Sequence, residues 1–505
     1  MTLTSLIVFP LMVSFILVFL RNERIIRFVT LGAGFIEMGL AVPLSLFDIH
    51  APGFQFVEHY AWVPQWGLSY YLGIDGISLL MILLTILLLP LCVLCSWKYI
   101  GKRIKEFHIC LLLMISVCIG AFAALDMVLF YVFWEAMLVP MYLIIAVWGG
   151  PRRKYASIKF IIYTLAASTL LLVAIIAFYF QTGTFSIPEI MASKFSFRFQ
   201  FWAFLALALA FAVKVPMFPF HTWLPAAHVE APTAGSVLLA SVLLKMGAYG
   251  FLRFCLPMTP DASVYFAPMM IAISIASIIY GGLVALGQKD MKKLIAYSSV
   301  AHMGFVTLGI FVFTARGIEG AVFQMLNHGV TTGALFMLVG AIYERTHSRE
   351  ITDNMGLAKF IPAYIGFFGL FSMSSLGFPG TNSFVGEALV LIGAFQNNVI
   401  IGALAIPGAM LAAAYMLRLL QKLAWGEPSK GKGLPDLNLR EWAYILPLAL
   451  LVFYLGLAPT LTRLTIDGSI PKTLSGVERV LADKNPDLLA HMSIITSTTC
   501  QGVQE

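Results

Sequence analysis

The sequence has few charged residues for its length. Lys and Arg number 32 and Asp and Glu 25 among 505 residues, so that charged side chains make up 11% of the chain. A typical soluble domain has about 25% charged residues. The apolar fraction is 60% and the mean hydropathy is +0.90. A water-facing shell cannot be built from so few charges, and the composition therefore excludes a soluble enzyme and predicts an integral membrane protein.

The sequence also lacks the motifs of nucleotide and redox cofactors. It contains no glycine-rich dinucleotide fingerprint and no P-loop, and its six Cys have no metal-type spacing. Cys92 and Cys95 lie on an apolar segment without a second pair, which is typical of buried, inert thiols. We expect no cofactor and no metal on this chain. The net charge of +7 fits the basic cytoplasmic loops of a membrane protein, so we expect no nucleic-acid partner.

Apolar runs of about 20 residues, long enough for a helix to cross the bilayer, recur along the whole sequence. They predict an all-α polytopic membrane protein with fourteen spans. The predicted spans are 3–20, 28–47, 76–97, 107–125, 127–148, 157–180, 200–220, 232–254, 264–286, 294–314, 318–342, 359–396 with an interruption, 399–421 and 442–461.

Basic residues are concentrated in alternate loops, as the positive-inside rule requires of the cytoplasmic side. The basic clusters lie at 21–27, 98–105, 152–159 and 289–293, whereas no Lys or Arg occurs between Phe28 and Trp97. This asymmetry predicts that both termini lie outside, on the periplasmic side of a bacterial inner membrane. The outer segment 48–75 alternates in polarity around Phe54–Tyr60, which favours a short β-hairpin.

Three charged residues fall in the middle of predicted spans. Glu135 lies about 14 Å along the fifth span, Lys214 about 21 Å along the seventh and Lys245 about 19 Å along the eighth, at 1.5 Å per residue. A charge at mid-membrane is costly and marks a functional site unless it is paired. A structural ion pair at Glu135 and a packing kink with a snorkelling Lys214 are the alternatives. Glu37, in the second span, is predicted to face an interface or lipid.

Two spans are predicted to be broken helices. Pro216, Pro219 and Pro225 follow Lys214 closely, and Gly377 to Asn382 interrupt the twelfth span before Glu387. Broken helices at corresponding places in two halves are typical of inverted repeats in transporters, with the ion site at the break. The breaks predict two inverted five-helix repeats, spans four to eight and nine to thirteen.

Four histidines lie on or beside these spans: His221, His228, His302 and His328. The ordinary pKa of histidine, near 6.5, suits a proton relay at physiological pH. A hydrogen-bonded core histidine is the alternative at each position. Metal binding is disfavoured because no carboxylate or Cys lies at ligand spacing.

Three segments carry a family resemblance. The run from Lys214 to Ser236 continuing through Lys245 to Gly250, the segment Ala296–Phe305 and the segment Gly377–Glu387 resemble the antiporter-like subunits of proton-pumping NADH:quinone oxidoreductase, respiratory complex I. The similarity covers nearly the entire membrane region. Within that family the chain looks most like the chain M branch, the homologues of mitochondrial chain 4. It stops soon after the last span, unlike chain L, and has Glu387 where chains L and N usually carry Lys.

The resemblance implies the organisation of the chain and its partners. Residues 1–106 would form three initial spans with the outer loop 48–75, residues 107–255 and 262–424 the two repeats, 440–463 the last span and 464–505 an outer tail. The chain would be a translocase subunit without redox chemistry of its own. FMN, iron–sulfur clusters and quinone are expected in partner subunits, and the neighbours would be the antiporter-like chains L and N and the lipid bilayer.

The resemblance also assigns roles to residues. Glu135 and Lys214 would form the first ion pair of a proton channel, Lys245 the central relay and Glu387 the terminal site, with the four histidines along a hydrated axis. Since burial disfavours the charged lysine and a nearby carboxylate favours it, a movement of Glu135 would switch the proton affinity of Lys214. Quinone reduction in partner chains would then drive one proton outward per cycle.

Two other functions remain open on the sequence alone. Multi-subunit cation/proton antiporters and membrane-bound hydrogenases contain subunits with nearly the same signature. A non-transporting scaffold is the third reading, and it predicts that neutral substitutions at Lys214 and Lys245 are tolerated.

Overall fold

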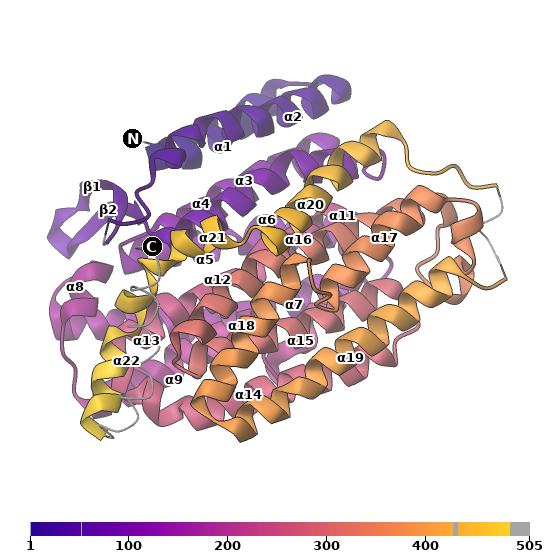
Figure 1. The fold of residues 1–505 in the computed structure, drawn as a ribbon. Helices are drawn as coiled ribbons and strands as arrows, with labels where there is room; N and C mark the ends of the chain where they lie inside the picture. The colour runs from indigo at the N-terminus through magenta and orange to yellow at the C-terminus, as the bar shows by residue number, and fades with distance from the viewer. Residues whose placement is uncertain (1, 52, 428–432, 485–505) are drawn as a thin grey trace, which may run out of the picture.

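The computed structural model describes residues 2–51, 53–427 and 433–484 as a bundle of long helices with one small hairpin (Figure 1). Thirteen helical segments in the described part are long and apolar enough to cross a membrane, and the shorter pair α17–α18 occupies the remaining predicted span, the twelfth. The all-α polytopic fold is therefore confirmed.

The first half of the chain contains α1 (Thr2–Phe19), α2 (Glu23–Leu40), β1 (Gln55–Val63), β2 (Leu68–Ile74), α3 (Gly76–Ser96), α4 (Ile104–Ala123), α5 (Met127–Ala136), α6 (Leu138–Trp148), α7 (Arg153–Thr182), α8 (Ile187–Ala192), α9 (Phe197–Lys214), α10 (Trp223–Glu230), α11 (Thr233–Leu238), α12 (Leu244–Gly250) and α13 (Leu256–Met258). The second half contains α14 (Pro260–Leu286), α15 (Met291–Phe311), α16 (Ala315–Thr346), α17 (Pro362–Ser375), α18 (Asn382–Asn397), α19 (Val399–Ala424), α20 (Leu439–Leu457), α21 (Thr460–Asp467) and α22 (Ile470–Lys484).

The predicted break in the seventh span is confirmed, but its predicted end at residue 220 is wrong. Helix α9 ends at Lys214, and after a non-helical stretch the chain resumes as α10 and continues to Glu230. Prolines stop the first half, and local partners satisfy the freed backbone: Trp223 Nε1 donates to the Val213 carbonyl at 2.8 Å, and Phe218 N donates to Ser277 Oγ at 2.9 Å. Both halves therefore belong to one interrupted span.

The eighth span is continuous from Thr233 to Met258 but contains two π-helical turns, at Leu239–Leu243 and Phe251–Cys255. A π-turn leaves carbonyl groups out of the regular α-helical pattern and is frequent at functional sites. The two π-turns flank α12, which carries Lys245. Hydrophobic periodicity did not predict them, because an apolar run shows no local signal for one extra residue per turn.

The break in the twelfth span lies between α17 and α18, as predicted. Gly377 and Gly380 have φ values of +75° and +90°, which favour glycine. Asn382, at the start of α18, fastens the break to α16: Asn327 Nδ2 donates to its carbonyl at 2.7 Å, and its side-chain oxygen accepts from Ser374 Oγ at 2.5 Å. Side-chain amides and hydroxyls thus replace the missing helical hydrogen bonds.

The two chain ends lie at the same end of the bundle, which we call the hairpin end because it also carries β1 and β2 (Figure 1). The predicted hairpin is confirmed, with β1 and β2 antiparallel and Glu58 opposite Leu72. A surface helix was expected over 477–489; α22 instead begins at Ile470, and residues beyond 484 lie outside the described part. The opposite end, called the basic end, carries the predicted basic loops.

Helices differ strongly in burial. The eighth span and α16 are buried along their whole apolar length and α15 almost so, whereas α1, α2, α7 and α19 leave most of their surface exposed. The buried helices carry Lys245, His302 and His328. The charged groups therefore lie on the innermost helices, where lipid does not reach them.

Candidate functional site: a buried chain of ionisable groups

Lys245 and His328 are in direct contact at the centre of the bundle. Lys245 Nζ lies 2.6 Å from His328 Nδ1, and it donates to the carbonyl of Ala240. Both side chains are almost fully buried, at 0% and 2% exposure. Ala240 belongs to the first π-turn, so that the irregular turn supplies an acceptor to the lysine on the next turn of the same span. The arrangement allows one proton to be shared between an amine and an imidazole.

His302 and Glu387 form the second direct contact. His302 Nδ1 lies 2.9 Å from Glu387 Oε1, and both side chains are buried. Gln324 Nε2 donates to the same carboxylate oxygen at 3.1 Å. A Cβ at Gly377 would lie 2.9 Å from Glu387 Oε2, so the glycine of the break leaves the space that the carboxylate occupies.

The two contacts adjoin each other. The rings of His302 and His328 have their centroids 5.8 Å apart, and His328 Nε2 has no hydrogen-bond partner among the described residues. His302 Nε2 lies 3.2 Å from Ser375 Oγ and 3.3 Å from Tyr415 OH. Lys245, His328, His302 and Glu387 thus form a row with a single gap, between the two imidazoles, and hydroxyl groups beside it.

Lys214 has different surroundings. Its Nζ lies 3.3 Å from Met137 Sδ and 4.9 Å from the centre of the Trp134 ring. Glu135 is next to Trp134 in α5, but its Oε1 has no hydrogen-bond partner in the described part of the chain. The structure therefore brings the two residues to the same place without joining them in the direct ion pair that was expected. A thioether and an aromatic face stabilise the ammonium weakly.

His221 and His228 lie near this row but hydrogen-bond to no described residue through either ring nitrogen. His228 is stacked on Phe336 with ring centroids 4.7 Å apart, and His221 packs beside Tyr280 and Tyr297. The core alternative, a histidine satisfied by protein hydrogen bonds, does not describe either residue. Buried polar groups normally have partners, so water is the partner that such rings would take.

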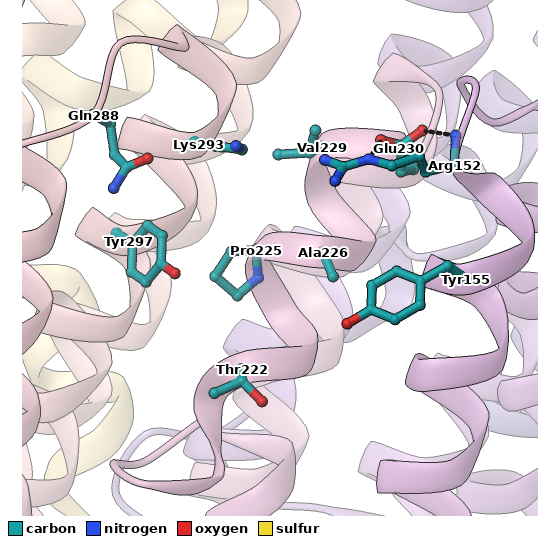
Figure 2. A pocket seen from close by; sticks show the side chains of 10 residues that line it. All are labelled: Arg152, Tyr155, Thr222, Pro225, Ala226, Val229, Glu230, Gln288, Lys293 and Tyr297. Atoms are coloured by element: carbon teal, nitrogen blue, oxygen red, sulfur yellow. Dashed lines mark hydrogen bonds and ion pairs between the residues drawn. The ribbon is translucent and has the colours of Figure 1, made fainter.

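A cavity of about 220 Å³ opens at the basic end beside His221 (Figure 2). Its walls come from α7, α10 and α15, and Figure 2 shows Tyr155, Pro225 and Tyr297 around the open space. Thr222, next to His221, forms part of the lining, and the rings of Tyr297 and His221 are 6.3 Å apart. The cavity is large enough for several waters and ends at the first histidine.

Glu230 closes one side of this cavity. Its carboxylate accepts from Arg152 N at 2.9 Å and lies 3.7 Å from Arg152 Nε, while its carbonyl accepts from Gly150 N at 2.8 Å. Lys292 and Arg349 donate to the adjacent carbonyls of Ala231 and Val229. Three consecutive carbonyls at the junction of α10 and α11 are therefore held by other helices, which fixes the position of His228.

Sequence reasoning missed the neutral partners of the row. Ser375, Gln324 and Tyr415 are common polar residues in helices, and only their contacts distinguish them. The prediction for Glu37 is wrong: its side chain is fully buried inside the chain, with both oxygens lacking a partner among the described residues. Helical periodicity placed it correctly in the second span but did not reveal which face packs inward.

Comparisons with known proteins agree with this architecture. The family described as "NADH:quinone oxidoreductase/Mrp antiporter, TM" matches residues 124–412, and "NADH-ubiquinone oxidoreductase chain 4, amino terminus" matches residues 5–121. NADH-quinone oxidoreductase subunit M of Rickettsia bellii is 48% identical over 418 residues, 82% of this chain and 85% of that protein.

Solved structures show the same fold. A chain of respiratory complex I from Thermus thermophilus is 32% identical, with a TM-score of 0.87 over 95% of this chain and 100% of that one. A chain of the Mrp complex from Dietzia is 23% identical, with a TM-score of 0.82 over 94% of this chain and 52% of that one; at that identity the likeness concerns the fold alone.

Proposed function

Since this chain belongs to the family of NADH-quinone oxidoreductase subunit M and mitochondrial chain 4, we propose that it moves protons across the membrane through its buried Glu/Lys/His axis. It is a membrane subunit of complex I, an enzyme whose cofactors we assign to other subunits. Quinone reduction in partner chains would supply the energy, and this chain would carry the proton.

The hydrogen-bonded row from Lys245 through His328 and His302 to Glu387 carries the proposal. Each member exchanges protons in its ordinary chemistry. Each is buried, so that a proton held there is isolated from both aqueous phases. A proton on Lys245 reaches Glu387 by crossing one gap, between His328 and His302, which one water or a small ring movement would bridge.

The first half of the path is the region of Glu135 and Lys214. The cavity beside His221 would bring water from the basic end, and Lys214 would receive the proton there. Because only a thioether and a ring contact the Lys214 ammonium, its charge depends strongly on the position of Glu135. Movement of Glu135 would thus load or release Lys214, and His228 would pass the proton on to Lys245.

The membrane setting follows from the family. We assign the basic end to the cytoplasm and the hairpin end, with both termini, to the periplasm of a bacterial inner membrane. The partners would be the other membrane-arm subunits, with chains L and N as neighbours. The units 107–255 and 262–424 would be the two halves of the path, one receiving the proton and one releasing it.

The alternative is a subunit of a cation/proton antiporter, favoured by the shared fold of the Mrp complex. The same axis would then exchange a proton for a cation without quinone chemistry. The relatives of highest identity named here are subunits of NADH-quinone oxidoreductase, which supports the complex I function. Dependence of proton movement on quinone reduction separates the two.

The test uses assembled complex in native membranes. Proton pumping and quinone reduction are measured together for Lys214→Ala and Glu135→Gln, with assembly checked on a native gel and Lys289→Ala, an exposed loop variant, as the control. We expect both activities to fall together in assembled complex for the first two variants only. Unchanged pumping in either would overturn the proposed role of these charges.

A further inference from the structure

A second buried ionic cluster lies at the hairpin end and is not part of the proposed axis. Arg253 NH2 lies 2.7 Å from Asp75 Oδ1, with the two side chains 5% and 9% exposed. Arg253 Nε donates to Tyr249 OH at 3.1 Å and its NH2 donates to Ser78 Oγ at 3.3 Å. We call these four residues the outer cluster. It joins the eighth span to the start of α3.

Segments from distant parts of the chain cover the outer cluster. The ring of Phe54, just before β1, lies 4.9 Å from Arg253 Cζ, and Lys472 Nζ of α22 lies 4.2 Å from the other side of the problem, the same ring's centre. Gly76 N donates to Ser469 Oγ at 3.1 Å. The hairpin and the C-terminal helices thus meet over the arginine and keep it out of water.

The outer cluster lies on the same span as the central lysine. Arg253 follows Lys245 by eight residues, about 12 Å along the helix at 1.5 Å per residue, and Tyr249 is midway between them. Residues four apart share a helix face, so Lys245, Tyr249 and Arg253 form a line toward the hairpin end. This line is the shortest way for a proton to leave Lys245 along its own helix.

An arginine on that line opposes the movement of a proton. Its guanidinium does not give up its proton in proteins, so it carries a permanent positive charge and accepts nothing. Pore-lining arginines exclude protons and cations by the same electrostatic repulsion. Asp75 and Ser78 hold the guanidinium in place. No proton acceptor in the cluster is free to take over a proton arriving at Tyr249 OH, which already contacts Ser78 and Arg253.

We propose that the outer cluster is an electrostatic seal which prevents Lys245 from exchanging protons with the hairpin-end face, so that its proton leaves sideways through His328. The proposal rests on the proposed function of Lys245 and adds a cause for its direction. It assigns Arg253 the role of a positioned fixed charge, and it assigns β1–β2 and α22 the role of covering that charge.

Asp75 lies just outside the span, and its ionisation supports the geometry. Burial acts to raise the pKa of Asp75, but the Arg253 guanidinium and the hydrogen bonds from Ser78 outweigh burial, and the pKa lies below its ordinary value. The carboxylate therefore stays ionised on the acidic side of neutrality. An outer compartment that becomes acidic during pumping would not release the arginine from its partner.

The experiment measures passive proton leak in membrane vesicles containing the assembled complex, with an imposed pH difference and no NADH. Arg253→Gln removes the fixed charge, and we expect the leak to become roughly tenfold faster, the change that about 1.4 kcal/mol off a barrier gives. In Arg253→Gln with Lys245→Ala the leak is expected to return to the original rate. An original rate in assembled Arg253→Gln, or a leak that persists in the double variant, would overturn the seal.

Arg253→Lys is the second variant, because it keeps the charge and most of the side chain and is the better tolerated change. Lysine can lose its proton whereas arginine does not. The expected leak is therefore near the original rate at pH 6 and rises toward pH 9, and an equal leak at both pH values would contradict the seal. Arg316→Gln is the matched control, since Glu319 keeps Arg463 as a partner there. Normal pumping in Lys245→Ala would refute the proposed function separately, whatever the leak of Arg253→Gln.

Discussion

The two lysines at mid-membrane occupy opposite kinds of surroundings. Lys245 contacts a carbonyl and an imidazole and begins a row of ionisable groups, while Lys214 contacts a thioether and an aromatic ring. Both are buried to the same degree. Burial alone therefore does not define a proton site. The partners decide whether a proton can move on from the lysine or must wait for another group to approach.

The comparison indicates a division of labour. The Lys245 half is already connected and can pass a proton with small movements. The Lys214 half is disconnected, and its conduction depends on the position of Glu135 and on water from the cavity at the basic end. A switch controlled by partner chains is expected in the disconnected half, because a connected row gives a distant signal little to change.

Removal of Lys245 should give the largest effect. Lys245→Ala takes away the amine that links the two halves, and proton transfer by a positioned group contributes roughly 10²-fold or more. We expect pumping to fall by at least that factor in assembled complex. Lys289→Ala, in an exposed loop, should retain full activity; comparable loss in both would show that the assay reports stability rather than the row.

Neutralising Glu387 should rank second. Glu387→Gln keeps the shape but removes the charge that contacts His302 Nδ1 and Gln324. A hydrogen bond to a charged group contributes about 1.5–3 kcal/mol, which corresponds to a fall of roughly tenfold to hundredfold in coupled activity. Glu387→Asp should recover part of it. Pumping assays on both variants, normalised to assembled complex, provide the measurement, and equal activity of the two would contradict a role of the charge.

The histidines should separate in the same sense. His302 contacts Glu387, Ser375 and Tyr415, whereas His228 has no described partner on its ring nitrogens. His302→Gln should lower coupled activity by roughly tenfold, the value of one hydrogen bond of about 1–1.5 kcal/mol, and His228→Gln by less. Quinone reduction and pumping are measured in parallel. The reverse order would indicate that His228 works through ordered water, and the connected row would lose its priority.

The smallest effect is expected at the ring that faces Lys214. Trp134→Leu keeps an apolar side chain in α5 but removes the cation–π contact, which contributes about 0.5–2 kcal/mol. Coupled activity should change only several-fold, with a larger change when Glu135→Gln is added. Additive effects in the double variant, measured as a mutant cycle, would mean that the ring and the carboxylate act on Lys214 independently.

Much of this arrangement could be predicted from the sequence. The spans, both breaks, the hairpin and the positions of Lys214, Lys245 and Glu387 followed from apolar length, proline and glycine, because these act locally along the chain. The second half of the seventh span was missed, since α10 is short and carries His228 and Glu230. The inward position of Glu37 was missed because a single carboxylate does not say which helix will cover it.

The sequence by itself determined that this is a membrane protein, where its helices run and which ionisable residues lie at mid-depth, because hydrophobic length and backbone-breaking residues leave their mark locally. Only the tertiary structure decided which of these residues touch. Lys245 meets His328 and His302 meets Glu387 across more than 80 positions of sequence, and Arg253 meets Asp75 across a greater distance still. Such contacts depend on how helices pack and on the π-turn beside Lys245, and no local pattern records them.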